Sequence, residues 1–230
     1  MYVKFVGKTV GLDKYSDLNS EEIVAAIARH GVVKKDNGKL VRYLMDHKHW
    51  SPLDMINFVF EIETSRAMGR HIIRHSSLKP QEYSQRYSDR VQFEPIELRK
   101  ESKVNRQSST EIFNPNIIPF ENPFTGEDEG NSFDAQTLIS EYLEDISSFY
   151  NKLLKAGVAK ECARMILPEC TTTTMTFNGT LRSWLSFLNV RVHEDAQKEV
   201  RDIAYLIGKY LENELPNVFN KINWKQGLFM

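Results

Sequence analysis

The spacing of hydrophobic residues predicts a chain that combines strands with long helices. Apolar and polar residues alternate over 2–10 and 58–63, and both stretches are rich in residue types that favour a pleated surface. Apolar residues three and four positions apart, the pattern of an amphipathic helix, recur through much of the remaining chain. We expect helices at about 19–31, 40–47, 64–76, 139–157, 158–167, 180–189 and 200–215.

One long stretch, residues 93–135, follows neither pattern. It lacks a sustained period and contains half of the eight prolines, so we interpret it as a long excursion with little regular structure. The β-branched run Thr171–Thr174 is expected to be extended. Helices toward both ends with strands between them indicate the α+β class, in a single domain that covers 1–230.

Size, charge and cysteine content narrow the class of protein. A chain of 230 residues suits one domain and buries roughly 70% of its unfolded surface. Its net charge of −1 gives no overall attraction for nucleic acid or an anionic membrane. No apolar run approaches the ~20 residues that span a bilayer, and the N-terminus lacks the apolar core of a signal peptide. With only two cysteines, we expect a soluble cytoplasmic protein without nucleic-acid or membrane partners.

Basic residues form a first candidate site on the third predicted helix. His71, Arg74 and His75 are spaced so that they share one face, which Arg66 and Arg70 continue. Fixed guanidinium groups on such a face suit phosphate or pyrimidine oxygens. The same spacing is typical of a solvated polar face, and spacing alone favours that interpretation.

The residues after Pro80 form a second candidate site. If the chain is extended, every second side chain points the same way, which groups Glu82, Ser84, Arg86 and Ser88. Arginine and serine donate to a phosphate, while a carboxylate accepts from a sugar hydroxyl or an amide. An amphipathic strand with its aromatic residues in the core explains the alternation equally well.

Further arginines lie in the second half of the chain. Arg164 is in the helix predicted to end before residue 168. Arg182, Ser186 and Asn189 share one helix face, and the apolar residues between them form the buried side. Arg191 lies near the end of that helix, where an arginine often only complements the helix dipole.

A metal site and a nucleophilic cysteine are both disfavoured. His71 and His75 lie one turn apart, but no Glu stands in the general-base position of a zinc protease, and neighbouring arginines oppose a dication. Neither Cys162 nor Cys170 has a histidine close in sequence, so we expect both to be small buried hydrophobic residues. The chain also lacks a glycine-rich phosphate loop.

Ordered sequence blocks resemble the flavin-dependent thymidylate synthases over most of the chain. The central motif of that family is matched by Arg74, His75, Glu82, Ser84, Arg86 and Tyr87. The other blocks, in the family's order, are His49–Asp54, Phe58–Phe60, Ser65–Ala67, Asn105–Ser109, Ala163–Pro168, Gly179–Trp184 and Arg191–Glu199. Several blocks in the right order are far more specific than any one of them.

Several positions depart from the family pattern. Ser76 stands where the Arg-His-Arg triplet has its second arginine, and Lys79 stands where a serine is usual. His71 replaces a Gln, and Asp54-Met55 replaces Glu-His. Ser76 removes a guanidinium that the family uses around the flavin, and Lys79 would restore a positive charge if its side chain points inward.

The resemblance implies two overlapping groups of site residues. The substrate dUMP would be held by His71, Arg74, Glu82, Ser84, Arg86, Arg164 and Arg191. The flavin FAD would be contacted by His49, Ser51, Arg74, His75, Ser76 and Glu82, and, from another subunit, by Thr180, Arg182 and Ser186. Arg191 would face the O2–N3 edge of the pyrimidine and stabilise developing negative charge, which makes it the candidate catalytic residue.

The implied reaction is the reductive methylation of dUMP to dTMP. In the family, 5,10-methylenetetrahydrofolate supplies the carbon, NADPH reduces FAD, and the flavin supplies the hydride. The implied fold is α+β, a mostly antiparallel sheet packed with long helices, assembled as a homotetramer with shared active sites. The alternatives are a related flavoenzyme with an altered one-carbon product and a nucleotide-binding relative without catalysis.

Overall fold

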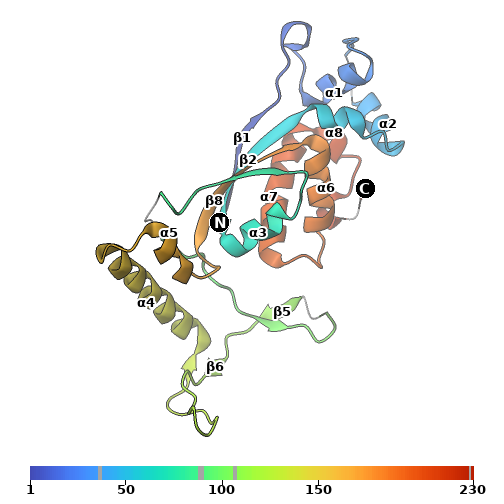
Figure 1. Ribbon diagram of the computed structural model, residues 1–230. Helices are drawn as coiled ribbons and strands as arrows, with labels where there is room; N and C mark the ends of the chain where they lie inside the picture. The colour runs from blue at the N-terminus through green and yellow to red at the C-terminus, as the bar shows by residue number, and fades with distance from the viewer. Residues whose placement is uncertain (36–37, 88–90, 106–107, 228) are drawn as a thin grey trace. The chain divides into compact units, whose positions relative to one another are not determined.

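The computed structural model describes residues 1–35, 38–87, 91–105, 108–227 and 229–230. These residues form two compact units, one made of 1–83 together with 173–230 and the other of 84–172 (Figure 1). The first unit therefore contains both ends of the chain. Within the described residues, no helix is long and apolar enough to cross a bilayer.

A four-stranded sheet lies at the centre of the first unit. In spatial order its strands are β1 (Tyr2–Lys8), β2 (Asn57–Ser65), β8 (Thr172–Thr180) and β3 (Lys79–Glu82). β1 pairs antiparallel with β2, and β3 pairs antiparallel with β8. Because β8 comes from the second half of the chain, it brings the helix that follows it next to residues of the first half.

Helices of the first unit pack on this sheet, with α3, α6 and α7 against one of its faces (Figure 1). The helices are α1 (Ser20–Ala28), α2 (Lys39–Asp46), α3 (Arg66–Ile73), α6 (Leu181–Arg191), α7 (Lys198–Glu214) and α8 (Pro216–Phe219). Short 3-10 turns are η1 (Asp13–Tyr15), η2 (Ser51–Met55) and η4 (Trp224–Gln226). Local sequence sets several of these boundaries: Asn19 and Glu22 form a capping box at α1, and Gly31, with φ of 84°, follows its end.

The core explains why α6 presents its polar side outward. Phe58, Phe60 and Ile62 alternate along β2 and are fully buried. The Trp184 ring of α6 meets Phe60 edge to face with 5.0 Å between ring centroids, and its indole nitrogen donates to the Phe58 carbonyl at 3.0 Å. Each such aromatic or aliphatic side chain contributes about 1.5–3 kcal/mol on burial. This packing fixes the rotation of α6, so that Arg182 on its other side is exposed.

The second unit contains the longest helix, α4 (Ala135–Lys155), followed by α5 (Lys160–Ala163) and the 3-10 turn η3 (Arg164–Ile166). Asp134 caps α4 by accepting from the Thr137 amide at 2.9 Å. Among the described residues of 93–135, two short antiparallel pairs form, β4 (Arg99–Glu101) with β5 (Ser109–Ile112) and β6 (Asn116–Ile117) with β7 (Phe133–Asp134). The predicted excursion is thus mostly irregular, with two small hairpins.

The α+β class is confirmed, and so are antiparallel pairs in the sheet. The extended chain considered for Glu82 to Ser88 is wrong. β3 ends at Glu82, and a turn follows in which the Tyr87 amide donates to the Ser84 carbonyl at 3.1 Å. The period-two grouping of side chains therefore stops at Glu82, and Ser88 lies outside the described residues, as do 106 and 107 of the downstream block.

Candidate functional site

The candidate catalytic arginine meets the predicted flavin-contacting histidine in the first unit. Arg191 is the last residue of α6, and His75 is the second residue after α3. The Arg191 Nε donates to His75 Nε2 at 2.8 Å. The His75 ring also packs edge to face on buried Phe187, with 5.1 Å between centroids. The structure thus joins residues 116 positions apart in the chain.

Positively charged side chains lie around the Arg191–His75 hydrogen bond. Burial, and next the Arg191 guanidinium, lower the pKa of His75 to about 4. Burial, then Arg191 and Arg74, also lower the pKa of His71. The pKa of Arg191 is lowered by burial and by Arg74. Both imidazoles are therefore neutral at pH 7 beside two guanidinium groups, an arrangement suited to an anionic ligand.

A second group forms at the start of α6. Thr180 caps the helix by accepting from the Ser183 amide at 3.1 Å, and its hydroxyl donates to Asp54 Oδ1 at 3.0 Å. The other oxygen of Asp54 accepts from Arg182 Nη1 at 3.1 Å. Asp54, which replaces the family's Glu, thus holds two of the residues predicted to contact the flavin.

Ser76 and Lys79 form a third contact, at the position where the triplet lacks its arginine. The Lys79 Nζ donates to the Ser76 carbonyl at 3.2 Å. Leu78 between them is buried, and Lys79 starts β3 opposite Asn178. The ammonium group consequently lies at the backbone carbonyl of Ser76, and both residues are exposed.

Glu82, at the end of β3, is held by two neighbours. Its Oε1 accepts from the hydroxyl of buried Thr173 at 2.9 Å and lies 3.4 Å from Arg66 Nη1. The sequence placed Arg66 on the same helix side as His71, and the structure adds that its guanidinium reaches this carboxylate. Both contacts involve Oε1, and together they hold the Glu82 carboxylate in one orientation.

The remaining predicted residues of the first unit lie at its surface. His49, Ser51, Arg74 and Ser186 are exposed, so their polar groups are open to a ligand or to another subunit. Asn189, one turn beyond Ser186, instead accepts from the backbone amides of 229 and 230 and holds the end of the chain.

Three predicted substrate contacts belong to the second unit: Ser84, Arg86 and Arg164. The Arg86 guanidinium lies 3.5 Å from the carboxylate of Glu161, and Arg164 Nε donates to the Glu161 carbonyl at 3.4 Å. Both arginines thus gather at Glu161, a residue that no sequence pattern singled out. Ser84 Oγ accepts from the Arg86 amide at 3.3 Å.

The expectation that both cysteines are buried is wrong. Cys162, in the four-residue helix α5, is exposed, and Cys170 is half-buried. Burial raises the pKa of the Cys170 thiol, and Glu94 raises it further. In the described part of the chain no three His, Cys, Asp or Glu side chains gather as metal ligands.

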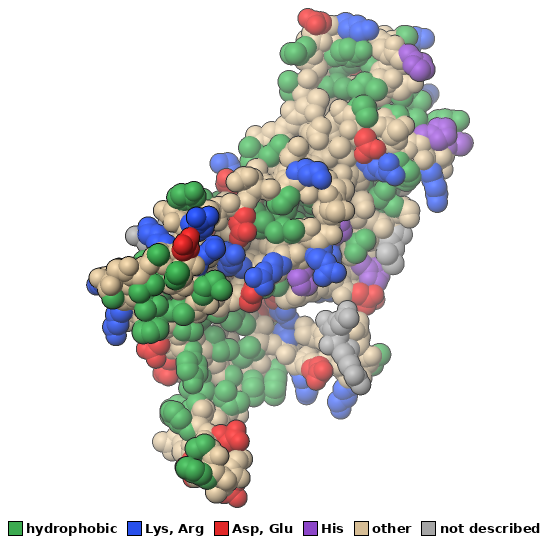
Figure 2. Space-filling model, viewed as in Figure 1, with side chains coloured by type: hydrophobic (Ala, Val, Ile, Leu, Met, Phe, Trp, Pro, Cys, Tyr) green, Lys and Arg blue, Asp and Glu red, His purple; other side chains and the backbone are tan. Residues whose placement is uncertain are grey.

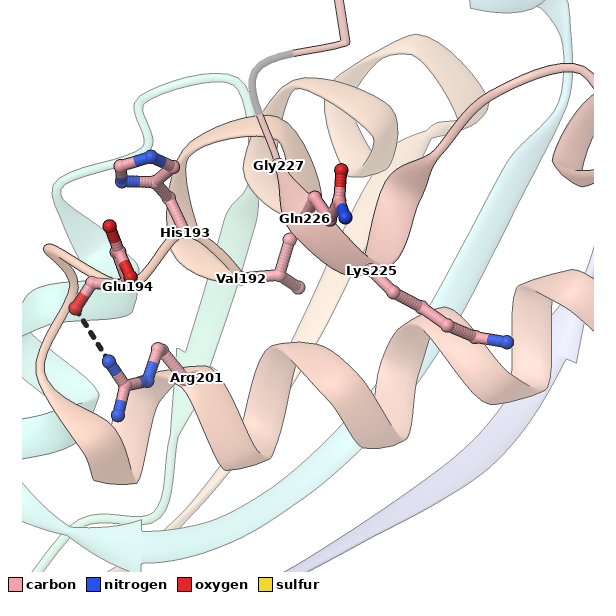
Figure 3. A pocket seen from close by; sticks show the side chains of 7 residues that line it. All are labelled: Val192, His193, Glu194, Arg201, Lys225, Gln226 and Gly227. Atoms are coloured by element: carbon pink, nitrogen blue, oxygen red, sulfur yellow. Dashed lines mark hydrogen bonds between the residues drawn. The ribbon is translucent and has the colours of Figure 1, made fainter.

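A cavity of about 790 Å³ adjoins the end of α6, directly after Arg191 (Figure 3). It is lined by Val192, His193, Glu194, Arg201, Lys225, Gln226 and Gly227. Its cationic groups already have partners: Arg201 donates to the Glu194 carbonyl at 2.5 Å, and Lys225 Nζ lies 3.3 Å from Glu212. In Figure 3 the Lys225 side chain extends away from Arg201, so the two charges do not converge.

Comparison with known proteins bears on these groupings. Residues 13–217 match the family described as thymidylate synthase complementing protein. The chain belongs to the flavin-dependent thymidylate synthases. A family member from Synechocystis is 33% identical over 210 residues, covering 90% of this chain and 91% of the relative. A probable flavin-dependent thymidylate synthase of Paramecium bursaria Chlorella virus 1 is 31% identical, with 89% and 91% covered. One from Kosmotoga olearia is 33% identical, with 77% and 72% covered.

A flavin-dependent thymidylate synthase needs donors for an anionic cofactor, and the first unit provides them. Arg74 and Arg182 have exposed side chains, and Lys79 adds an ammonium group at Ser76. Neutral His75 offers a ring and one N–H. These groups fit the phosphate of a flavin cofactor, which can only accept hydrogen bonds.

Proposed function

We propose that this flavin-dependent thymidylate synthase converts dUMP to dTMP, with 5,10-methylenetetrahydrofolate as carbon donor, NADPH as reductant and FAD as hydride carrier. The observation that carries the proposal is the Arg191–His75 hydrogen bond at 2.8 Å, because it joins the two residues that the family resemblance assigns to substrate and flavin. When bound, the flavin supplies the redox chemistry. The protein's own residues bind, orient and stabilise charge.

Arg191 has the properties of an electrostatic stabiliser. It is half-buried, and its Nε is occupied by His75, so both terminal nitrogens are available to a pyrimidine edge. A guanidinium retains its protons, so it stabilises negative charge that develops on the ring instead of accepting a proton. His71 and Arg74 next to it would hold the nucleotide, together with Glu82.

The test is release of tritium from C5-labelled dUMP by the purified protein with FAD, NADPH and 5,10-methylenetetrahydrofolate. Arg191→Ala should lower turnover by about a hundredfold or more, because one preorganised donor to the developing charge is lost. Val190→Ala, at the exposed neighbouring position, is the control and should retain turnover. Absence of tritium release by folded, FAD-supplied wild-type protein would rule the proposal out.

The cysteines provide a second check. The raised pKa of the half-buried Cys170 thiol makes it a poor nucleophile for the pyrimidine, and the proposed route uses neither Cys170 nor exposed Cys162. The double variant Cys162→Ser/Cys170→Ser should therefore keep turnover within about twofold of wild type. A loss of activity in the folded double variant would indicate a thiol-dependent mechanism instead.

We also propose a cytoplasmic homotetramer whose active sites are shared between subunits. The two free cysteines support the cytoplasmic location, because they suit a reducing compartment. Large apolar residues are exposed on the second unit, where Figure 2 shows hydrophobic side chains gathered over α4 and the β6–β7 hairpin.

A further inference from the structure

The structure assigns His75 the role of a positioning residue, which holds the Arg191 guanidinium through Nε2 and sets the direction of its two terminal nitrogens. The expected effect on dUMP binding rests on the proposed function, whereas the hydrogen bond between His75 and Arg191 does not. The family resemblance implies that His75 contacts the flavin. The inference adds a second contact for His75, on the side of the substrate.

The chemistry of the two groups fixes the state of the imidazole. A guanidinium nitrogen can only donate, so the ring nitrogen 2.8 Å from Arg191 Nε must be the acceptor. Nε2 therefore carries no proton, and the neutral ring has its proton on Nδ1. The ring can therefore make two hydrogen bonds. Its Nε2 accepts from Arg191, and its Nδ1–H is a donor on the opposite side of the ring.

The backbone of His75 is anchored more firmly than the arginine side chain. The His75 amide donates to the Ile72 carbonyl at 3.0 Å, and its own carbonyl accepts from the Leu78 amide at 2.9 Å. Ile72 and Leu78 are both buried, and the imidazole packs on buried Phe187. The ring is thus held by buried residues of the first unit, while the long Arg191 side chain takes its direction from its hydrogen bond to the ring.

Repulsion between neighbouring guanidinium groups explains why Arg191 needs a partner that orients it. Arg74 and His71 from α3 and its C-cap, and Arg191 from α6, are the charged or titratable groups that act on one another here. Arg74 repels Arg191, and nothing in that repulsion favours a pyrimidine-facing orientation. A neutral acceptor opposes the repulsion with a hydrogen bond to a charged donor, which is stronger than a neutral pair.

Two variants separate positioning from packing. His75→Phe keeps a ring on Phe187 but removes the acceptor, whereas His75→Gln places an amide oxygen where Nε2 lies. By calorimetry, His75→Phe should bind dUMP about tenfold more weakly, and His75→Gln within about threefold of wild type. FAD affinity, measured separately by flavin fluorescence, should change less than dUMP affinity in both. Equal dUMP affinities for the two variants, or a loss confined to FAD, would overturn the assignment.

Imidazole ¹⁵N resonances test the hydrogen bond without any ligand. We expect His75 to show an unprotonated Nε2 and to titrate at about 4 in the wild type, and to titrate higher in Arg191→Ala. Protonation turns Nε2 into a donor that repels Arg191, so dUMP affinity should fall as the pH drops through about 4, and the His75→Gln variant should lack this step. A protonated Nε2 at pH 7 would contradict the inference. If the spectra agree but wild-type protein binds no dUMP, the positioning contact stands and the proposed function fails.

Discussion

Ser76 and Lys79 are two departures from the family pattern that the structure brings into contact. The ammonium group of Lys79 donates to the backbone carbonyl of Ser76, the residue that stands in place of the family's second triplet arginine. Buried Leu78 and the pairing of Lys79 with Asn178 fix the backbone on both sides. We propose that the two changes compensate one another in charge, although not in the forked geometry of a guanidinium.

This compensation predicts a rescue. Lys79→Ala should weaken FAD binding by about three- to fivefold, because an exposed cation contributes at most about 1 kcal/mol. Adding Ser76→Arg to that variant should restore the affinity or exceed it. Fluorescence titration of flavin-free protein measures the constants, and Lys4→Ala, an exposed lysine on β1, serves as the control. If Lys79→Ala leaves FAD binding unchanged, Lys79 does not act as the substitute cation.

At the scale of elements, features set by neighbours in sequence were predictable from the sequence, whereas features set by long-range pairing were not. The alternation of Phe58, Phe60 and Ile62 and the caps of α1 and α6 were predictable because they depend on neighbours in sequence. The end of β3 at Glu82 was not, because it depends on where the strand leaves β8: the Tyr83 amide still donates to the Thr174 carbonyl, and Ser84 turns away.

In the candidate site, too, the residues could be predicted from the sequence but their long-range contacts could not. Resemblance to the family identified Arg191, His75 and Arg182 from sequence blocks. It could not show that Arg191 bonds to His75 or that Arg182 pairs with Asp54, since these partners lie 116 and 128 positions apart. Spacing within one helix carries no information on such contacts. Similarly, the exposure of Cys162 follows from the short helix α5, which the helical pattern did not distinguish from a longer buried one.

The junction between β8 and α6 contains Thr180, which the proposed function places at the flavin. Thr180 ends the strand, caps the helix through the Ser183 amide and donates to Asp54. Thr180→Ala should lower the free energy of unfolding by about 1 kcal/mol, the usual cost of a lost N-cap, and should also weaken FAD binding. Thr180→Ser retains the hydroxyl and should keep most of both properties.

Urea unfolding followed by circular dichroism measures the first effect, and fluorescence titration measures the second. An alanine variant with wild-type stability would show that the capping contact is not significant. A loss of stability with unchanged FAD affinity would separate the helix cap from the cofactor site.

At the scale of the whole molecule, α4 has an apolar stripe that the described chain leaves open. Tyr142 and Phe149 lie seven positions apart on one side of the helix and are 55% and 54% exposed. In contrast, α6 and α7 bury their apolar sides in the core of the first unit. A helix that exposes two aromatic residues on one stripe is typical of a subunit interface.

Assembly through this stripe yields a prediction that connects structure with activity. If the chain forms the proposed homotetramer, Tyr142→Lys/Phe149→Lys should lower the mass measured by light scattering from that of four 26.7 kDa chains toward smaller species, because buried ammonium groups lose hydration without gaining partners. Glu144→Lys/Asn151→Lys, two exposed positions with the same seven-residue spacing on another side of α4, should leave the mass unchanged. If active sites are shared, turnover should fall together with mass, since Thr180, Arg182 and Ser186 then no longer reach a neighbour's flavin. A dissociated variant with full turnover would show that each chain forms a complete site by itself.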